Sequence, residues 1–243
     1  MIHSAVLLAA GRGKRQRPYT DSTPKPLLEV DGRPTLDYVL RAARKAGVER
    51  VCIVTQYLEE QIFAYVGDGS RWGLEASFAH QVELRGSGDA LRSVPLDWIR
   101  DEPVMVVATD YILEEDSLAE LVRAHAAHRA DMTMSLKACP VEELMARCSV
   151  EVDAAGWVSK IIEKPQRDEI LSPFAASIMF IFPPQIWAYL RKITPSPRGE
   201  VEMQTAVEMM LEEGFSAYGV LQEPPREWSA PDGLSAPDAS GKY

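Results

Sequence analysis

Two glycines followed by basic residues near the amino terminus have the chemistry of an anion-binding loop. Gly11 and Gly13 follow the apolar run at residues 5–10, which is typical of a buried parallel strand that enters a turn. Glycine has no side chain to hold a ligand away, so backbone N–H groups can approach phosphate oxygens closely there. In a chain whose formal net charge is −10, local positive charge predicts an anionic ligand, most simply a triphosphate. The basic residues near this turn are Lys14, Arg15, Arg17 and Lys25.

The spacing of this loop differs from two common phosphate-binding motifs. It does not fit G-x-x-x-x-G-K-[ST], so the usual P-loop is excluded. Gln16 stands where the third glycine of G-x-G-x-x-G would be, which argues against a dinucleotide fingerprint. The chain has instead G-x-G-x-R-x-x-P from Gly11, followed by P-K-P at residues 24–26. This fuller pattern resembles the signature of the sugar-1-phosphate nucleotidyltransferases, whereas the glycines alone would fit an ordinary tight turn.

That resemblance implies a reaction and a set of binding residues. The reaction joins a nucleoside triphosphate and a sugar-1-phosphate to give a nucleotide sugar and pyrophosphate, with Mg²⁺ as cofactor. The resemblance implies that Arg15 binds the β- and γ-phosphates, that Lys25 lies at the α-phosphate, and that both act with Asp110 in catalysis. The residues expected to bind the nucleotide are Leu8, Ala10, Gly11, Gly13, Lys14, Arg15, Gln81, Gly86 and Asp110.

Asp110 follows the clearest strand pattern in the chain, residues 104–108. A carboxylate at the carboxyl end of a central strand commonly holds Mg²⁺ that bridges nucleotide phosphates, although many such aspartates only cap turns or helices. Thr109 precedes it where the family usually has glycine. The family also carries a second metal-binding aspartate in a W-x-D motif, but this chain has Trp228-Ser229-Ala230. We therefore expect Asp110 with the nucleotide phosphates to suffice, and Asp232 to be dispensable.

A second glycine-bearing loop follows the strand expected at residues 74–79. A glutamine amide carries an acceptor and two donor hydrogens, so it can read the edge of a base. In thymidylyltransferases of the resembled family, a glutamine followed five residues later by a glycine contacts the pyrimidine. Gln81 and Gly86 match that spacing. The resemblance therefore favours a pyrimidine nucleotide, where the residues alone would favour an ordinary polar loop.

Three further segments are expected to bind the acceptor. Glu163-Lys164-Pro165 matches the E-K-P that closes the sugar-phosphate site in the family, and Lys164 offers a point charge to a second phosphate. Ser149 falls where a sugar-contacting glycine often lies, and Glu200 lies in an R-G-E-x-E sequence whose glutamate binds sugar hydroxyls in thymidylyltransferases. A surface charge pair and a glutamate near a helix N-terminus are the alternatives. The expected acceptor residues are Lys25, Ser149, Glu163, Lys164 and Glu200.

The order of expected elements predicts an α/β fold. Strands at residues 5–10, 51–54 and 74–79 alternate with helices that start at residues 35 and 58. This alternation predicts a Rossmann-like, mixed but mainly parallel sheet flanked by helices, a three-layer sandwich with ligands at the carboxyl ends of the strands. Residues 1–222 are expected to form a single domain, and residues 223–243 an irregular tail rich in Pro, Ser, Gly and Asp. A helix at residues 117–128 is expected to begin with a capping box.

The composition excludes several classes of function. The hydrophobic fraction of 46% is sufficient for a core, and the net negative charge argues against a nucleic-acid partner. No apolar run is long enough to cross a membrane, so a cytoplasmic protein is expected, and homo-oligomerisation stays open. Three cysteines without C-x-x-C spacing indicate neither a disulfide framework nor a zinc site. His125 and His128 are expected to be ordinary surface residues. The cysteines are Cys52, Cys139 and Cys148.

Three alternative functions stay open at this point. The acceptor could be a phosphorylated alcohol, a cyclitol phosphate or a phosphonate rather than a sugar phosphate. The chain could be a non-catalytic regulatory module on the same fold, although Arg15, Lys25 and Asp110 together have no physical role there. A dinucleotide-dependent oxidoreductase is disfavoured because Thr55, and not an acid that could hold a ribose, follows the second strand.

Overall fold

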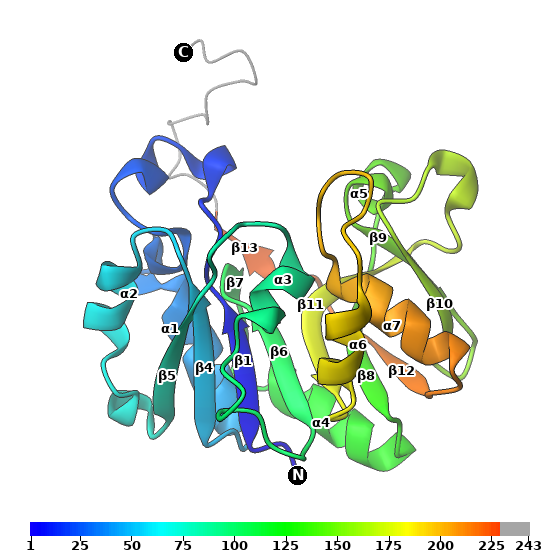
Figure 1. The fold of residues 1–243 in the computed structure, drawn as a ribbon, viewed down its shortest axis with the longest axis horizontal. Helices are drawn as coiled ribbons and strands as arrows, with labels where there is room; N and C mark the ends of the chain where they lie inside the picture. The colour runs from blue at the N-terminus through cyan, green and yellow to red at the C-terminus, as the bar shows by residue number, and fades with distance from the viewer. Residues whose placement is uncertain (229–243) are drawn as a thin grey trace.

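A nine-stranded sheet forms the middle layer of the molecule (Figure 1). In this computed structural model, which describes residues 1–228, the strand order is β5-β4-β1-β6-β11-β8-β12-β10-β9. Strands β5, β4, β1 and β6 are parallel, and β11 runs antiparallel to both β6 and β8. The strand bounds are β1 Ser4–Leu8, β4 Arg50–Thr55, β5 Glu75–His80, β6 Val104–Ala108, β8 Met132–Ala138, β9 Cys148–Val152, β10 Trp157–Glu163, β11 Phe174–Phe182 and β12 Ala217–Leu221.

Helices cover both faces of the sheet because its central strands are apolar on both faces. In β1, Ala5 and Leu7 belong to one core and Val6 to the other, as the alternation of side chains along a strand requires. The first core includes side chains of α1 (Thr35–Lys45), α2 (Glu59–Val66) and α4 (Ser117–His128). The second includes those of α3 (Ser87–Arg92), α5 (Val141–Ala146), α6 (Ile186–Lys192) and α7 (Met203–Glu212). The expected three-layer α/β architecture is confirmed.

The expected capping box of α4 is wrong. Ser117 is already the first helical residue, and Asp116 holds the cap position without a side-chain hydrogen bond to the helix. The reason is a preceding turn, in which the Ser117 N–H donates to the Glu114 carbonyl at 3.1 Å. The two histidines of this helix also differ from each other. His128 is exposed and stacks on Tyr218, but His125 is half-buried with Nδ1 2.9 Å from Thr133 Oγ1, so it is not a surface residue.

Residues 226–228, which the sequence places in an irregular tail, lie against ordered segments of the domain, and residues 226–227 belong to a separate two-stranded sheet. Strand β13 (Arg226–Glu227) pairs antiparallel with β7 (Tyr111–Ile112), which follows Asp110 directly. The Trp228 indole N–H donates to the carbonyl of Glu29 in β2 (Glu29–Val30), which pairs with β3 (Arg33–Pro34). Asp232 lies outside the described residues. In the described part of the chain, no helix has the length and apolar character to cross a membrane.

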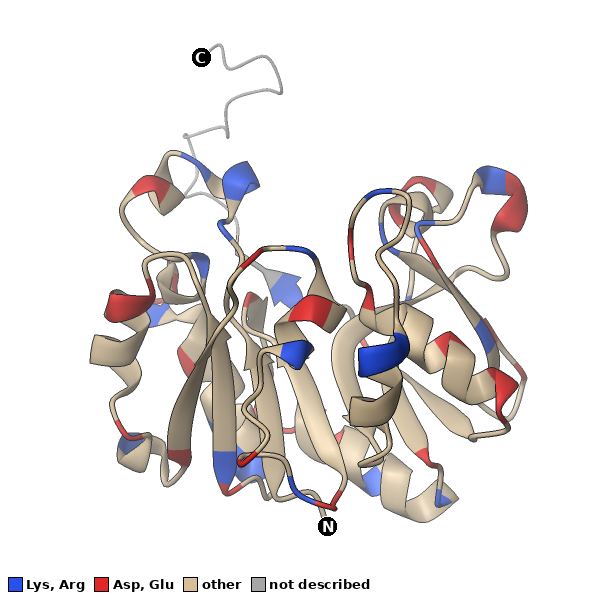
Figure 2. Ribbon diagram, viewed as in Figure 1, with Lys and Arg blue, Asp and Glu red and all other residues tan. Residues whose placement is uncertain are grey.

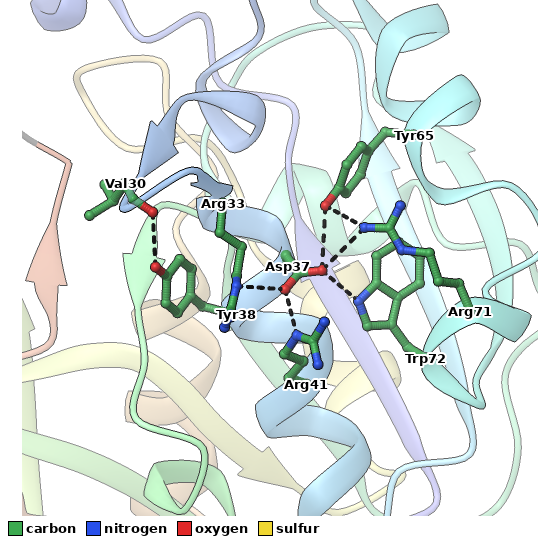
Figure 3. A network of polar contacts seen from close by, with 8 residues as sticks. All are labelled: Val30, Arg33, Asp37, Tyr38, Arg41, Tyr65, Arg71 and Trp72. Carbon is green, nitrogen blue, oxygen red and sulfur yellow. Dashed lines mark hydrogen bonds and ion pairs between the residues drawn. The ribbon is translucent and has the colours of Figure 1, made fainter.

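A buried carboxylate, Asp37, joins α1 to the segments that follow β4 (Figure 3). Asp37 is 1% exposed, and it accepts hydrogen bonds from Arg41 Nε at 2.6 Å and from the Trp72 indole N–H at 2.9 Å. Burial alone would raise the pKa of Asp37, but these hydrogen bonds and the charge of Arg41 outweigh it, so the pKa lies below its ordinary value of 3.8. Three further side chains complete the network: Arg33, Arg71 and Tyr65.

We expect Asp37→Asn to lower the free energy of unfolding by about 2 kcal/mol at pH 7. The loss stays below that of a fully buried ion pair because the three arginines are about half exposed and can turn to water. Because the folded-state pKa of Asp37 is lowered, the difference between wild type and variant should shrink as the pH falls below 3.8. Urea unfolding measures it, with the exposed Asp97→Asn as control; equal stabilities of wild type and Asp37→Asn at pH 7 would contradict it.

Candidate functional site

The loop after β1 is built from three short turns above the carboxyl end of that strand. These are η1 (Lys14–Gln16), η2 (Tyr19–Asp21) and η3 (Lys25–Leu27). Gly13 adopts a left-handed conformation with φ 59°, and its carbonyl accepts a hydrogen bond from Thr20 Oγ1 at 2.8 Å. A Cβ at Gly13 would lie 2.8 Å from Thr20 Cγ2, so the loop itself requires glycine. At Gly11 nothing lies within 4 Å of that position, which leaves its backbone open to a ligand.

A cavity of about 400 Å³, which we call the first cavity, lies between this loop and the ends of β1, β5 and β6. All residues expected to bind the nucleotide line it, and so does Lys25. Several lining residues were not expected. Most of them are small or apolar side chains at strand and helix ends, which carry no chemical signal in a sequence. They are Ala9, Gln16, Pro26, Leu84, Ser87, Ala90, Ala108, Thr109 and Ile178.

An ion pair connects the two sides of the first cavity. Lys25 Nζ donates to Asp110 Oδ2, and both side chains are largely shielded from solvent. The buried hydroxyl of Thr35, at the start of α1, lies 2.9 Å from the Thr109 carbonyl and 3.2 Å from the Pro26 carbonyl. Thr35 therefore holds the backbone next to Lys25 and the backbone next to Asp110 close to each other.

Thr109, which stands where the resembled family has glycine, has a structural role. Its Oγ1 donates to the Leu8 carbonyl at 2.8 Å and thereby ties the end of β6 to the end of β1. This hydrogen bond keeps Asp110 beside the glycine loop.

Two basic side chains of the loop have no partner in the described part of the chain. Arg15 and Lys14 line the first cavity, and no hydrogen bond or ion pair joins either side chain to another described residue. Figure 2 shows that Lys and Arg residues are concentrated on this loop above the sheet. A guanidinium presents a planar fork of donors that matches phosphate oxygens bidentately. At Lys14 and Arg15 the loop therefore offers positive charge that no described acidic side chain neutralises.

A second cavity of about 320 Å³ shares Arg15 and Ile178 with the first. Ile178 lies where the register of β11 against β8 shifts, and its N–H donates to the Tyr111 hydroxyl at 3.1 Å. Because two cavities meet at one arginine, two ligands could present anionic groups to the same side chain. The second cavity is lined by Arg15, Tyr111, Glu143, Ala146, Arg147, Cys148, Glu163, Ala176, Ile178 and Gln204.

Glu163 is the expected acceptor residue that lines the second cavity. Its Oε2 is buried and has no hydrogen-bond partner among the described residues. Burial and the nearby charge of Glu202 raise the pKa of Glu163 to about 7, against the opposite effect of Lys164 and Arg198. A buried carboxylate oxygen without a partner is costly unless a ligand supplies a donor, so this atom points to a hydroxyl or another hydrogen-bond donor on the ligand.

Ser149, in contrast, does not line the second cavity. It is fully buried, and its Oγ accepts the N–H of Leu171 at 3.0 Å and lies 3.2 Å from the carbonyl of Ser172. The preceding residue, Cys148, lines the cavity instead. Neighbouring residues of a strand point to opposite faces, so Cys148 and not Ser149 presents its side chain to this cavity, and a sugar contact of Ser149 stays a prediction. Burial raises the pKa of the Cys148 thiol to about 12, which makes it unreactive.

Lys164 and Glu200, the remaining expected acceptor residues, contact each other. Lys164 Nζ lies 2.6 Å from Glu200 Oε2 and 3.9 Å from Glu202 Oε1. The structure therefore brings these two expected residues together beside Glu163, but with their charges paired.

The acceptor side also contains polar residues that the sequence analysis missed. Glu143 and Arg147 line the second cavity from α5 and its end, 2.9 Å apart at Glu143 Oε1 and Arg147 Nε. Their i,i+4 spacing was the available signal, but it is also the spacing of an ordinary helix-surface pair. Gln204 reaches the same cavity from the first turn of α7.

Asp110 is the donor that could hold a divalent cation in the first cavity. It is the only carboxylate among the described residues that line the cavity, and no described group of three or more His, Cys, Asp or Glu side chains could hold a metal. One carboxylate with substrate phosphates and waters fits Mg²⁺, which rarely uses an all-protein cage. The donor set therefore fits a cation that arrives with a polyphosphate.

Comparisons with known proteins show the family and the fold of this chain. A sequence model described as nucleotidyl transferase matches residues 4–229. The chain is 32% identical to UTP–glucose-1-phosphate uridylyltransferase AglF of Haloferax volcanii, over 86% of this chain and 84% of that protein. It is 34% identical to a glucose-1-phosphate thymidylyltransferase of Streptomyces griseus, over 86% of this chain but only 58% of that protein. A crystal structure of UDP-glucose pyrophosphorylase complexed with UDP-glucose shares the fold, with a TM-score of 0.80, 20% identity and 90% of each chain covered.

The ion pair of Lys25 with Asp110 predicts that the protein alone binds divalent cations weakly. A cation must displace the lysine, so Lys25→Met should tighten the binding of Mn²⁺ about tenfold, the effect of losing one charge-assisted hydrogen bond. Electron paramagnetic resonance of free Mn²⁺ measures this without nucleotide. Asp110→Asn is the control and should bind no more tightly than wild type. Unchanged or weaker binding by Lys25→Met would contradict the prediction.

Proposed function

Because the chain belongs to the nucleotidyl transferase family, we propose that it transfers a nucleotidyl group from UTP or dTTP to a sugar-1-phosphate. The nucleotide sugar and pyrophosphate are the products. The observation that carries this proposal is the position of Arg15, which lines both cavities at once and has no hydrogen-bond or ion-pair partner among the described residues. The first cavity has the glycine loop for a polyphosphate, and the second has the unpartnered Glu163 for an acceptor hydroxyl.

The proposed reaction requires little covalent chemistry from the protein. An oxygen of the acceptor phosphate attacks the α-phosphorus, a new P–O bond forms, and the bond to the β-phosphate breaks with its electron pair leaving on pyrophosphate. The protein must hold two polyanions in line and stabilise the charge that develops. In this proposal Lys25 contacts the α-phosphate and Arg15 the leaving β- and γ-phosphates. Lys164 exchanges its pairing with Glu200 for the acceptor phosphate.

Mg²⁺, which this family typically uses, would be held by Asp110 and the nucleotide phosphates. When bound, it neutralises phosphate charge at the reacting centre. Lys25 would then leave Asp110 and turn to the α-phosphate. The ion pair thus keeps the lysine close to the position at which it is needed.

The names of the relatives and the acceptor side of the site favour a sugar as the acceptor. The two relatives named above act on glucose-1-phosphate. A sugar offers several hydroxyl donors, and Glu163 provides a buried acceptor without a partner. A phosphorylated alcohol with a single apolar or cationic end would leave that oxygen without a hydrogen bond.

Pyrophosphate release tests the proposal directly. Purified protein is incubated with Mg²⁺, glucose-1-phosphate and UTP, dTTP, CTP, ATP or GTP in turn, with phosphocholine and inositol phosphate as alternative acceptors. We expect release with UTP or dTTP and the sugar phosphate. Arg15→Ala should lower kcat by about 10²–10³-fold with a smaller change in KM, because its interactions grow as charge moves to pyrophosphate. Arg15→Lys should also be poor, since a point charge cannot replace the fork.

Arg12→Ala is the matched control for Arg15. Arg12 belongs to the same loop, but it lies over the Tyr57 ring and does not line the first cavity. Its loss should leave kcat nearly unchanged. Release of pyrophosphate only with a non-sugar phosphate would overturn the proposed acceptor, and near-normal turnover of Arg15→Ala would overturn the role of Arg15.

The raised pKa of Glu163 predicts a pH dependence of acceptor use. The ionised carboxylate accepts a hydroxyl hydrogen, so kcat/KM for the sugar phosphate should fall as the pH drops below about 7. In Glu163→Gln, the fall of kcat/KM below about pH 7 that is caused by protonation of Glu163 should disappear. The part of the pH dependence that is caused by ionisation of the substrate phosphate should remain. Glu143→Gln is the control, because Lys137 holds the pKa of Glu143 below its ordinary value. Identical profiles for wild type and Glu163→Gln would show that Glu163 does not contact the acceptor.

A further inference from the structure

We infer that Asp89 is a positioning residue that turns the Gln81 amide so that the site accepts an imide base, uracil or thymine, and rejects cytosine. This inference rests on the proposed function only in placing the base of the nucleotide in the first cavity. Asp89 itself does not line that cavity, so it acts through Gln81.

The side chain of Gln81 is held in one place. Gln81 follows β5, is 3% exposed, and its backbone N–H donates to the Thr55 carbonyl at the end of β4. Its Nε2 donates to Asp89 Oδ2 at 3.0 Å and to the Gly86 carbonyl at 3.3 Å. Both amide hydrogens are therefore used inside the protein.

Asp89 decides which end of the Gln81 amide faces it. Asp89 lies in the first turn of α3, is 8% exposed, and its other oxygen is 3.3 Å from Arg85 Nη2. A carboxylate only accepts hydrogen bonds, so it attracts the NH₂ end of the amide and repels the carbonyl end. The reversed orientation of Gln81 would place Oε1 against Asp89 and against the Gly86 carbonyl, three acceptors with no hydrogen between them.

The remaining polar atom of the Gln81 side chain is an acceptor. No described residue donates to Oε1, and Gln81 lines the first cavity. Uracil and thymine carry a hydrogen on N3, which can be donated to this oxygen. Cytosine has no hydrogen on N3, so the lone pair of N3 would face the lone pairs of Gln81 Oε1 and no hydrogen bond could form. This contact does not discriminate against guanine, because guanine also carries a ring N–H donor.

The backbone around this contact leaves little freedom for rearrangement. Gly86 has φ 106°, and a Cβ on it would lie 2.7 Å from the Val201 carbonyl. That carbonyl accepts the Gly88 N–H at 2.9 Å, and Ser87 Oγ accepts the Met203 N–H at 3.1 Å. The loop that presents Gln81, Gly86 and Asp89 is therefore fixed against the start of α7.

Nucleotide binding without acceptor tests the inference by itself. Isothermal titration with Mg²⁺ and either UTP or CTP gives the ratio of the two dissociation constants. Wild type should prefer UTP by about ten- to a hundredfold, and Asp89→Asn should reduce this preference about tenfold, because asparagine can donate to Oε1 and stabilise the reversed amide. Asp89→Glu keeps an acceptor-only group and should retain the preference. Asp89→Ser, whose hydroxyl can also donate, replaces Asp89→Asn should that variant fail to fold.

A double-mutant cycle separates positioning from a structural effect. If Asp89 acts through Gln81, then Asp89→Asn should change the UTP-to-CTP ratio in wild type but not in the Gln81→Ala background. An equal change in both backgrounds, or an unchanged ratio in Asp89→Asn, would overturn the inference. A wild type that binds UTP and CTP equally would overturn it too. A preference for UTP that depends on Asp89 only when Gln81 is present, but without pyrophosphate release, would contradict the proposed reaction and support the inference.

Discussion

The contact of Lys25 with Asp110 is the interaction on which the geometry of the site depends. It joins a lysine of the loop after β1 to a carboxylate at the end of β6, and Thr35 at the start of α1 holds the neighbouring backbone of both. Helix α1 is in turn fixed by the network around Asp37. A charge inside a cavity is costly without a partner, so Lys25 and Asp110 stabilise each other. A polyphosphate with its cation could replace both partners at once, because the phosphate would pair with Lys25 and the cation with Asp110.

The charge distribution explains how an acidic protein can bind two polyanions. The chain carries a net charge of −10, yet its basic side chains in the first cavity, Lys14, Arg15 and Lys25, face a single carboxylate. Focused positive charge attracts phosphates to this edge, while the acidic surface elsewhere repels them. Arg15 lies between the cavities, where the phosphates of two ligands would meet.

The loop at residues 81–89 and the acceptor side of the site are held together by the segment before α7. The Val201 carbonyl accepts the Gly88 N–H, and the segment before α7 also carries Glu200, which pairs with Lys164 beside Glu163. A shift of this segment would move the base contact and the acceptor contact together. The two proposed ligand positions are therefore coupled by backbone hydrogen bonds as well as by Arg15.

The α/β fold, the glycine loop and the place of Asp110 at a strand end were predictable from the sequence, because apolar runs, glycines and a strand-end carboxylate are local signals. The sequence did not reveal what the strand face, burial and tertiary packing decide. Cys148 and not Ser149 lines the second cavity, since a shift of one residue along a strand reverses the face. Glu163 was expected, but its missing hydrogen-bond partner and raised pKa follow only from burial. The orientation of Gln81 was equally absent from the sequence pattern, because it depends on how the loop between β5 and α3 brings Asp89 to the Gln81 amide.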